Sequence, residues 1–119
     1  GEMPDFGLIL LGIGADGHTA SLFPGTWALT VRGVPVVENV VPQLDTVRIT
    51  LTVPVLTEAD NIMVLAAGAD KAPAVQRALE APYAPEQTPA QYIRTASGTV
   101  VWLLDEAAAS QLTGRRSAG

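Results

Sequence analysis

Apolar residues cluster along this chain into short continuous runs that are separated by polar turns. Three of the runs, "FGLILL" (residues 6–11), "NIMVLAA" (61–67) and "TVVWLL" (99–104), end at a glycine or an acidic residue. Runs of this length are typical of strands buried on both faces, as in parallel sheets covered by helices. A fourth run, "VPVVENVV" (34–41), predicts an edge strand.

The segment "TVRITLTV" (46–53) has a different pattern, in which apolar and polar residues alternate. Because successive side chains of a strand point to opposite faces, this pattern predicts a strand with one buried face. We expect the apolar set that starts at Val47 to be buried. Arg48, Thr50 and Thr52 should then present a guanidinium and two hydroxyls on the other face.

Helical segments are predicted between and after these strands. They are "VLTEAD" (55–60), "KAPAVQRALE" (71–80), with Asp70 as its N-cap, and "DEAAASQL" (105–112), capped by Asp105. Strands that alternate with helices predict an α/β fold with a mainly parallel sheet flanked by helices, in a single domain over residues 1–119.

These helices are too few to cover both faces of such a sheet. The runs 6–11 and 99–104 are apolar on both faces, whereas cover comes chiefly from the helices at 71–80 and 105–112. We therefore expect the isolated chain to self-associate or to expose an apolar patch larger than the roughly few hundred Å² that soluble monomers usually tolerate.

The amino-acid composition excludes several classes of function. The 119 residues carry a formal net charge of -5, which argues against binding to nucleic acid or to an anionic membrane surface. The chain has no cysteine, so disulfides and thiolate metal sites are excluded, and a cytoplasmic location is compatible with this composition. No apolar stretch approaches the ~18 residues of a membrane span, and the N-terminal residues resemble no signal peptide.

The stretch "LILLGIGADGHTASLFPG" holds three glycines, Gly12, Gly14 and Gly17, in the spacing of a dinucleotide fingerprint, and Glu38 follows 21 positions after the last. A dinucleotide crossover needs roughly ten or more helical residues after that glycine. Here a helix over "HTASLF" (18–23) would be stopped by Pro24 and Gly25. Nucleotide binding is therefore the weaker interpretation.

A catalytic interpretation starts from His18, the only histidine, which follows this turn at the end of a buried strand. The carboxyl ends of strands in open α/β sheets form the ligand crevice, and a histidine there can exchange protons with a substrate near neutral pH. The alternative is a structural, hydrogen-bonded histidine. Asp16 is either a turn residue or the group that orients His18.

The residues "LLGIGADGHTASLFPG" resemble the signature of the 6-phosphogluconolactonases, within the superfamily that includes the glucosamine-6-phosphate deaminases. The resemblance continues through "RITLTVPVL", "VLAAGADKAPAVQRALE", "PAQYIR" and "VVWLLDEAAAS", and so covers nearly the whole chain. The deaminases have "FNEP" where this sequence has "SLFP", and their glutamate is absent. This departure favours a lactonase over a deaminase.

This resemblance implies a NagB-like fold and hydrolysis of 6-phospho-D-glucono-1,5-lactone in the oxidative pentose phosphate pathway, with no metal or cofactor. It implies that His18 is the acid/base residue, either as base toward water or as acid toward the ring oxygen. Lys71 resembles a phosphate contact, Arg48 is placed near the substrate, and Arg94 is expected to be structural. The residues implied to line the crevice are Gly12, Gly14, Asp16 and Gly17.

Members of the resembled family are about twice as long as this chain, which resembles their C-terminal half. A missing N-terminal half, or self-association in its place, would then be needed to complete the pocket, and we expect the isolated chain to hydrolyse the lactone no faster than buffer. The alternatives are a noncatalytic or assembly-dependent half-domain, a deaminase-like isomerase and a nucleotide-binding module.

Overall fold

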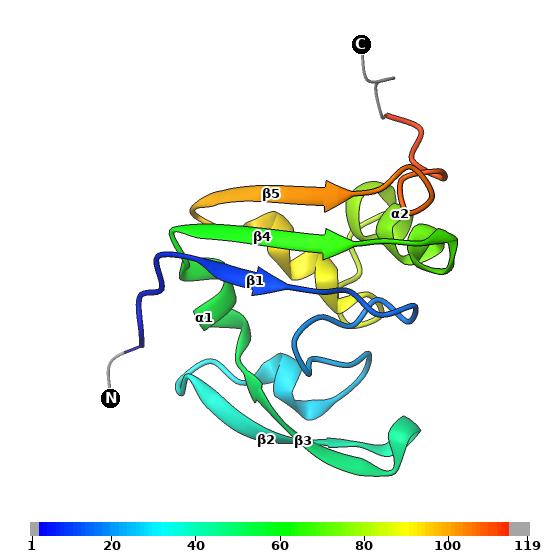
Figure 1. The fold of residues 1–119 in the computed structure, drawn as a ribbon. Coiled ribbons are helices and arrows are strands. Elements are labelled where there is room, and N and C mark those ends of the chain that lie inside the picture. The colour runs from blue at the N-terminus through cyan, green and yellow to red at the C-terminus, as the bar shows by residue number, and fades with distance from the viewer. Residues whose placement is uncertain (1–2, 115–119) are drawn as a thin grey trace.

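Three parallel strands form the main sheet of the computed structural model, which describes residues 3–114. Their order is β1 (Ile9–Leu11), β4 (Asn61–Ala66) and β5 (Thr99–Leu104), side by side in Figure 1. The register places Leu11 beside Val64 and Val64 beside Trp102. All three strands were expected from their apolar runs, although β1 is shorter than the run 6–11.

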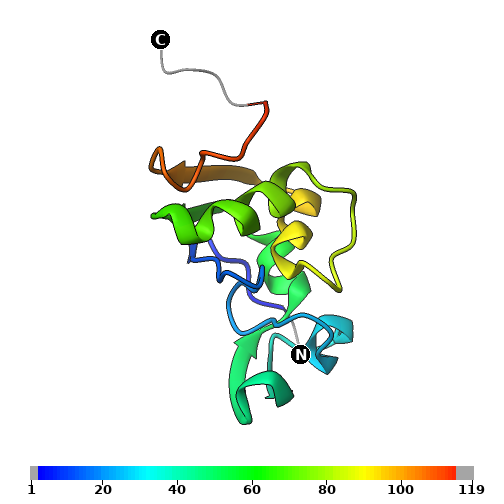
Figure 2. The ribbon, with the colours of Figure 1, turned by 90° about the vertical axis from the view of Figure 1, so that its right-hand side faces the viewer.

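The α-helices and a neighbouring 3-10 helix cover one face of this sheet, behind it in the view of Figure 1, and the turned view in Figure 2 shows them close together. The α-helices are α1 (Val53–Glu58) and α2 (Ala72–Glu80). The short 3-10 helices are η1 (Trp27–Thr30), η2 (Pro42–Leu44), η3 (Ala69–Lys71) and η4 (Pro89–Thr95). None of these helices in residues 3–114 has the length and apolar character that a bilayer crossing needs.

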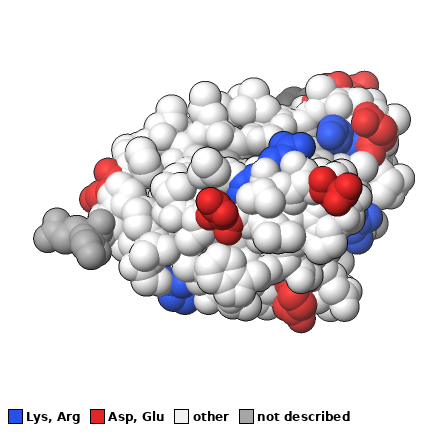
Figure 3. Space-filling view, turned by 90° about the horizontal axis from the view of Figure 1, so that it is seen from below, with Lys and Arg blue, Asp and Glu red and all other residues white. Residues whose placement is uncertain are grey.

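An antiparallel hairpin, β2 (Val36–Val41) and β3 (Thr46–Leu51), lies apart from the sheet, at the bottom of Figure 1. Its register pairs Asn39 with Arg48. Seen from this side, acidic and basic side chains are interspersed on a mostly uncharged surface (Figure 3). The parallel sheet and its helices confirm the α/β fold class.

The apolar core lies between the sheet and the helices. Ile62 and Val64 of β4 pack with Leu56 of α1 in one cluster, and Val75 of α2 packs with Ile13 in a second. Each of these side chains is buried. Burial of this kind is the main stabilising contribution to the fold.

The opposite face of the sheet is not covered by residues 3–114. Its exposed apolar side chains, at fractions from 41% to 61%, are Leu8, Leu10, Leu65, Val101 and Leu103. We call these five residues the open face. These exposed side chains agree with the expected uncovered apolar surface, whereas its area and the self-association of the chain stay predictions. Burial of the strands on both faces is wrong for this part of the chain.

The orientation of β3 differs from the prediction. Val47 and Ile49 are 54% and 73% exposed, whereas Thr50 and Thr52 are buried. The physical reason is hydrogen bonding: the Thr50 hydroxyl accepts the Ser21 N–H (3.1 Å), and the Thr52 hydroxyl donates to the Val34 carbonyl (2.7 Å). These hydroxyls tie the strand to neighbouring loops, so both threonines face inward. Arg48 of the same polar set is exposed, and Val53 of the apolar set is buried as expected.

Two helix predictions are also wrong. Residues 106–111 form turns instead of a helix, although Asp105 still caps them by accepting the N–H of Ala108 (2.8 Å). The same carboxylate accepts the Gly68 N–H (3.1 Å), which holds it between two loops. Residues 18–23 form no helix either, because a bridge pairs Thr19 with Leu22.

The start of α2 is displaced by one residue from the expected position. Lys71 occupies the N-cap position and its side chain makes no capping hydrogen bond. Asp70 lies in the preceding η3 helix, so the prediction that it caps α2 is wrong. This places the ammonium group of Lys71 at the first turn of the helix.

A charge introduced on one face of β1 should affect stability differently from a charge introduced on the other face. Leu10→Glu, on the open face, should change the free energy of unfolding by no more than about 0.5 kcal/mol and reduce binding of an apolar dye. Leu11→Glu, its neighbour on the covered face, should unfold the chain because the carboxylate would lack a partner. Thermal denaturation and dye fluorescence measure both, and equal destabilisation by the two substitutions would contradict an open face.

Candidate functional site

The glycine-rich turn after β1 makes room for His18, because its glycines have no side chains. The Gly14 N–H donates to the His18 carbonyl (2.9 Å), and the Gly17 N–H donates to the Gly14 carbonyl (2.9 Å). A Cβ on Gly14 would overlap the His18 imidazole, so the ring occupies the space of the missing side chain. Any residue larger than glycine at position 14 would displace the histidine.

Gly17 and Gly12 have different roles in this turn. Gly17 has a φ of +88°, and a Cβ there would approach the Thr88 side chain to 2.9 Å, so both conformation and packing require glycine. A Cβ on Gly12 would meet nothing within 4 Å. Gly12 therefore borders open space.

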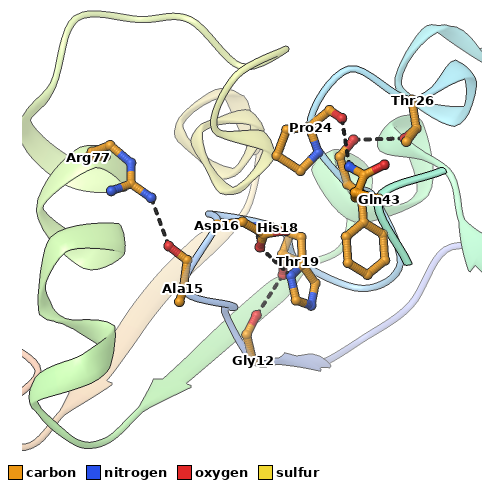
Figure 4. A network of polar contacts seen from close by, with 10 residues as sticks. Gly12, Ala15, Asp16, His18, Thr19, Pro24, Thr26, Gln43 and Arg77 are labelled. Carbon is orange, nitrogen blue, oxygen red and sulfur yellow. Dashed lines mark hydrogen bonds and ion pairs between the residues drawn. The ribbon is translucent and has the colours of Figure 1, made fainter. Parts of the chain in front are cut away.

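Asp16 and His18 form a close pair. The Asp16 Oδ1 lies 2.6 Å from the His18 Nδ1 and also accepts the His18 backbone N–H at 3.0 Å (Figure 4). Burial acts to raise the pKa of the Asp16 carboxyl, but the hydrogen bonds from His18 outweigh it, and the pKa lies below its ordinary value. An ionised carboxylate only accepts hydrogen bonds, so Nδ1 is the donor of this pair, and Nε2 of a neutral imidazole with this tautomer can accept a proton.

Contacts from other elements anchor the turn. Arg77 of α2 donates from its guanidinium to the Ala15 carbonyl (3.0 Å), and the Thr19 hydroxyl donates to the Gly12 carbonyl (2.8 Å), as Figure 4 shows. The Ala90 N–H in η4 donates to the Gly17 carbonyl (3.0 Å). The turn is therefore held from α2, from η4 and from within itself.

Two buried amides that the sequence analysis missed support the same region. Asn39 of β2 accepts the Ala28 N–H (3.1 Å) and donates to the Ser21 carbonyl (3.0 Å). Gln91 of η4 donates to the carbonyl of Arg77 (2.8 Å), the residue that anchors the turn. The signal for Asn39 was a polar residue inside the apolar run "VVENVV", whereas nothing in the pattern distinguished Gln91.

A pocket of about 310 Å³ opens beside the turn. It is lined by the end of β1, by the turn and by the half-buried Lys71; the lining residues are Leu10, Leu11, Gly12, Ile13, Gly14, His18, Ala20 and Lys71. The start of α2 adds a partial positive charge to the ammonium group. The pocket is thus lined by both an imidazole and an ammonium group.

The remaining predicted residues lie elsewhere. Asp16 contacts the pocket only through His18, Gly17 is buried behind the turn, and Arg48 is exposed on the hairpin and does not line the pocket. Contact between Arg48 and a substrate stays a prediction. The Arg94 guanidinium donates to the carbonyls of Ala78 and Ala81 (both 2.8 Å) at the end of α2, so its structural role is confirmed.

The dinucleotide interpretation lacks its helix. The fingerprint requires a helix to follow the last glycine so that its N-terminus receives the pyrophosphate. Residues 18–26 are not helical, and Glu38 lies on the hairpin opposite Ile49. Gly14 leaves room for the His18 ring and Gly17 allows the turn to form, whereas Gly12 borders open space.

Known proteins similar to this chain indicate its family. The chain is 45% identical to a probable 6-phosphogluconolactonase 1 of Oryza sativa subsp. japonica, covering 93% of this chain and 39% of that protein. It is 43% identical to the 6-phosphogluconolactonase of Synechocystis sp., covering 94% and 45%. The crystal structure of 6-phosphogluconolactonase from Leishmania guyanensis superposes with a TM-score of 0.82 at 33% identity, covering 97% of this chain and 44% of that one.

The chain thus spans about two fifths of the length of the curated relatives that it matches. The sequence model of the family described as glucosamine-6-phosphate isomerases/6-phosphogluconolactonase matches residues 1–102, which include β1, the glycine turn, Lys71 and most of β5. By this match, and by a likeness to solved structures that extends over nearly its whole length, the chain belongs to the glucosamine-6-phosphate isomerase/6-phosphogluconolactonase family.

Proposed function

We propose that this chain carries the histidine side of a 6-phosphogluconolactonase site and takes part in the hydrolysis of 6-phospho-D-glucono-1,5-lactone to 6-phosphogluconate, a cytoplasmic step of the oxidative pentose phosphate pathway. The observation that carries the proposal is the Asp16–His18 pair opening on a pocket that also holds Lys71. The similarity to 6-phosphogluconolactonases supports this choice of substrate. Residues 19–25 carry no carboxylate, which favours the lactonase over the deaminase.

His18 would act first as a base. Its Nε2 accepts a proton from water as the water oxygen forms a bond to the lactone carbonyl carbon. The imidazolium then donates that proton to the ring oxygen as the bond between this oxygen and the carbonyl carbon breaks. The products are the carboxylic acid and the sugar hydroxyl, and His18 returns to its neutral form.

Asp16 would act through His18. Its carboxylate holds the proton on Nδ1, which leaves Nε2 unprotonated before the reaction and stabilises the imidazolium afterwards. The lowered pKa of Asp16 keeps this carboxylate ionised at neutral pH.

Lys71 would bind the 6-phosphate. It is the only lysine among the seven Lys and Arg residues, and it lines the same pocket as His18 in a chain whose net charge is -5. Its place before the first turn of α2 adds the dipole of the helix to the charge of the ammonium, and both attract a phosphate dianion.

The first test concerns His18. We suggest a chimera in which residues 1–119 replace the aligned segment of the Synechocystis relative, because the chain spans less than half of that protein. His18→Ala in the chimera should lower kcat for the lactone by about 10²- to 10⁴-fold. Circular dichroism checks the fold, and an unchanged kcat in a folded variant would refute the proposal.

The second test concerns the tautomer. Asp16→Asn should lower kcat, because the side-chain amide can donate to Nδ1 and leave the proton on Nε2. The ¹⁵N shifts of the single histidine report which nitrogen is protonated in the 119-residue chain. If Nε2 stays unprotonated in the variant and kcat still falls, Asp16 does not act by selecting the tautomer.

The third test concerns phosphate. Lys71→Gln in the chimera should raise KM for the phosphorylated lactone much more than KM for unphosphorylated gluconolactone, because only the first substrate loses an ion pair. The comparison of the two substrates within one variant is its own control. An equal change in both KM values would show that Lys71 does not bind the phosphate.

A further inference from the structure

We propose that Phe23 is a positioning residue for His18, which holds the plane of the imidazole so that Nε2 keeps its direction. The role in catalysis rests on the proposed function, whereas the positioning itself does not. Phe23 contributes no polar side-chain atom and acts only through the ring that it contacts.

The two rings are stacked. Their centroids lie 4.2 Å apart and their planes differ by 22°. Phe23 is 4% exposed, whereas the His18 side chain is 30% exposed. One face of the imidazole is therefore covered by an aromatic ring, and the side chain keeps access to water and to the pocket.

This stack supplies a restraint that the carboxylate does not. The hydrogen bond from Nδ1 to Asp16 restrains the position of one ring nitrogen but contacts neither face of the imidazole. A stacked ring opposes a tilt of the ring plane because tilting would open a gap on one side and a clash on the other. The two contacts therefore restrain the direction of Nδ1 and the tilt of the ring plane.

Phe23 is itself held by hydrogen bonds that lead to the hairpin. Its carbonyl accepts the backbone N–H (3.2 Å) and the hydroxyl (2.7 Å) of Thr26. The Thr26 hydroxyl accepts from the side-chain amide of Asn39 (2.9 Å), which is fully buried in β2. The hairpin thus fixes the backbone position of the ring that contacts His18.

Phe23 is a buried apolar residue whose ring lies outside the two main core clusters. Of these clusters of residues 3–114, the first contains its neighbour Leu22. Its described aromatic contact is with His18. A leucine could fill much of the same space but could not present a flat face.

The first experiment uses the 119-residue chain and its single histidine. In the proton spectrum, the ring protons of His18 should lie upfield of those of a free histidine, because they lie over the face of Phe23. Phe23→Leu should remove this displacement, and Phe23→Tyr, which keeps the ring, should retain it. The matched control is Phe6→Leu at the other phenylalanine of the chain, which should leave the His18 signals unchanged.

The second experiment measures kcat and KM in the chimera. Phe23→Leu should lower kcat by about 2- to 10-fold, the range expected for loss of an aromatic pair, with a smaller change in KM. In a His18→Ala background the same substitution should cause no further loss. A general structural role would instead lower kcat equally in both backgrounds, and that result would overturn the proposal.

The two sets of results separate the two proposals. If His18→Ala leaves kcat intact but Phe23→Leu still shifts the His18 protons, the stack is real and the lactonase proposal has failed. If His18→Ala abolishes activity but Phe23→Leu changes neither the proton shifts nor kcat in a folded protein, the positioning role of Phe23 is wrong. Thermal denaturation of each variant confirms that a folded chain is being compared.

Discussion

The site depends on the absence of a side chain at Gly14. The imidazole of His18 occupies the volume where a Cβ would stand, and the turn closes around it through hydrogen bonds between Gly14, Gly17 and His18. This close approach brings Nδ1 to 2.6 Å from Asp16, which lies only two residues away in the chain. A larger residue at position 14 would separate the histidine from both its carboxylate and the pocket.

The local sequence motif predicted much of this site, because the central residues of the site are neighbours in the sequence. The turn that joins Gly12, Asp16 and His18 spans seven residues after a strand whose apolar run was plain. The supports were harder to predict because each comes from a distant segment. Asn39 and Gln91 act through backbone groups far from them in sequence, and a composition-based pattern carries no information about such partners.

The errors in side-chain orientation share one physical cause, which is that hydrophobicity alone was used to assign the buried face. Thr50 of β3 and Thr52, which follows the strand, face inward because their hydroxyls bond to loop groups, and the apolar Val47 and Ile49 face outward. In the main sheet the strands are apolar on both faces, yet residues 3–114 cover only one. An apolar side chain in a strand indicates that burial would be favourable and does not show which element supplies it.

The hairpin supports the segment after the glycine-rich turn through its hydrogen bonds. A two-stranded ribbon is marginally stable by itself, and the inner face of this one is rich in groups that can bond to loops rather than to a sheet. Asn39 uses three hydrogen bonds to hold the segment from Ser21 to Ala28, which follows the histidine turn directly. Because an unpaired amide in this buried position would be costly, the segment and the hairpin are fixed together. The direction of the His18 ring therefore depends on a strand that contributes no residue to the pocket.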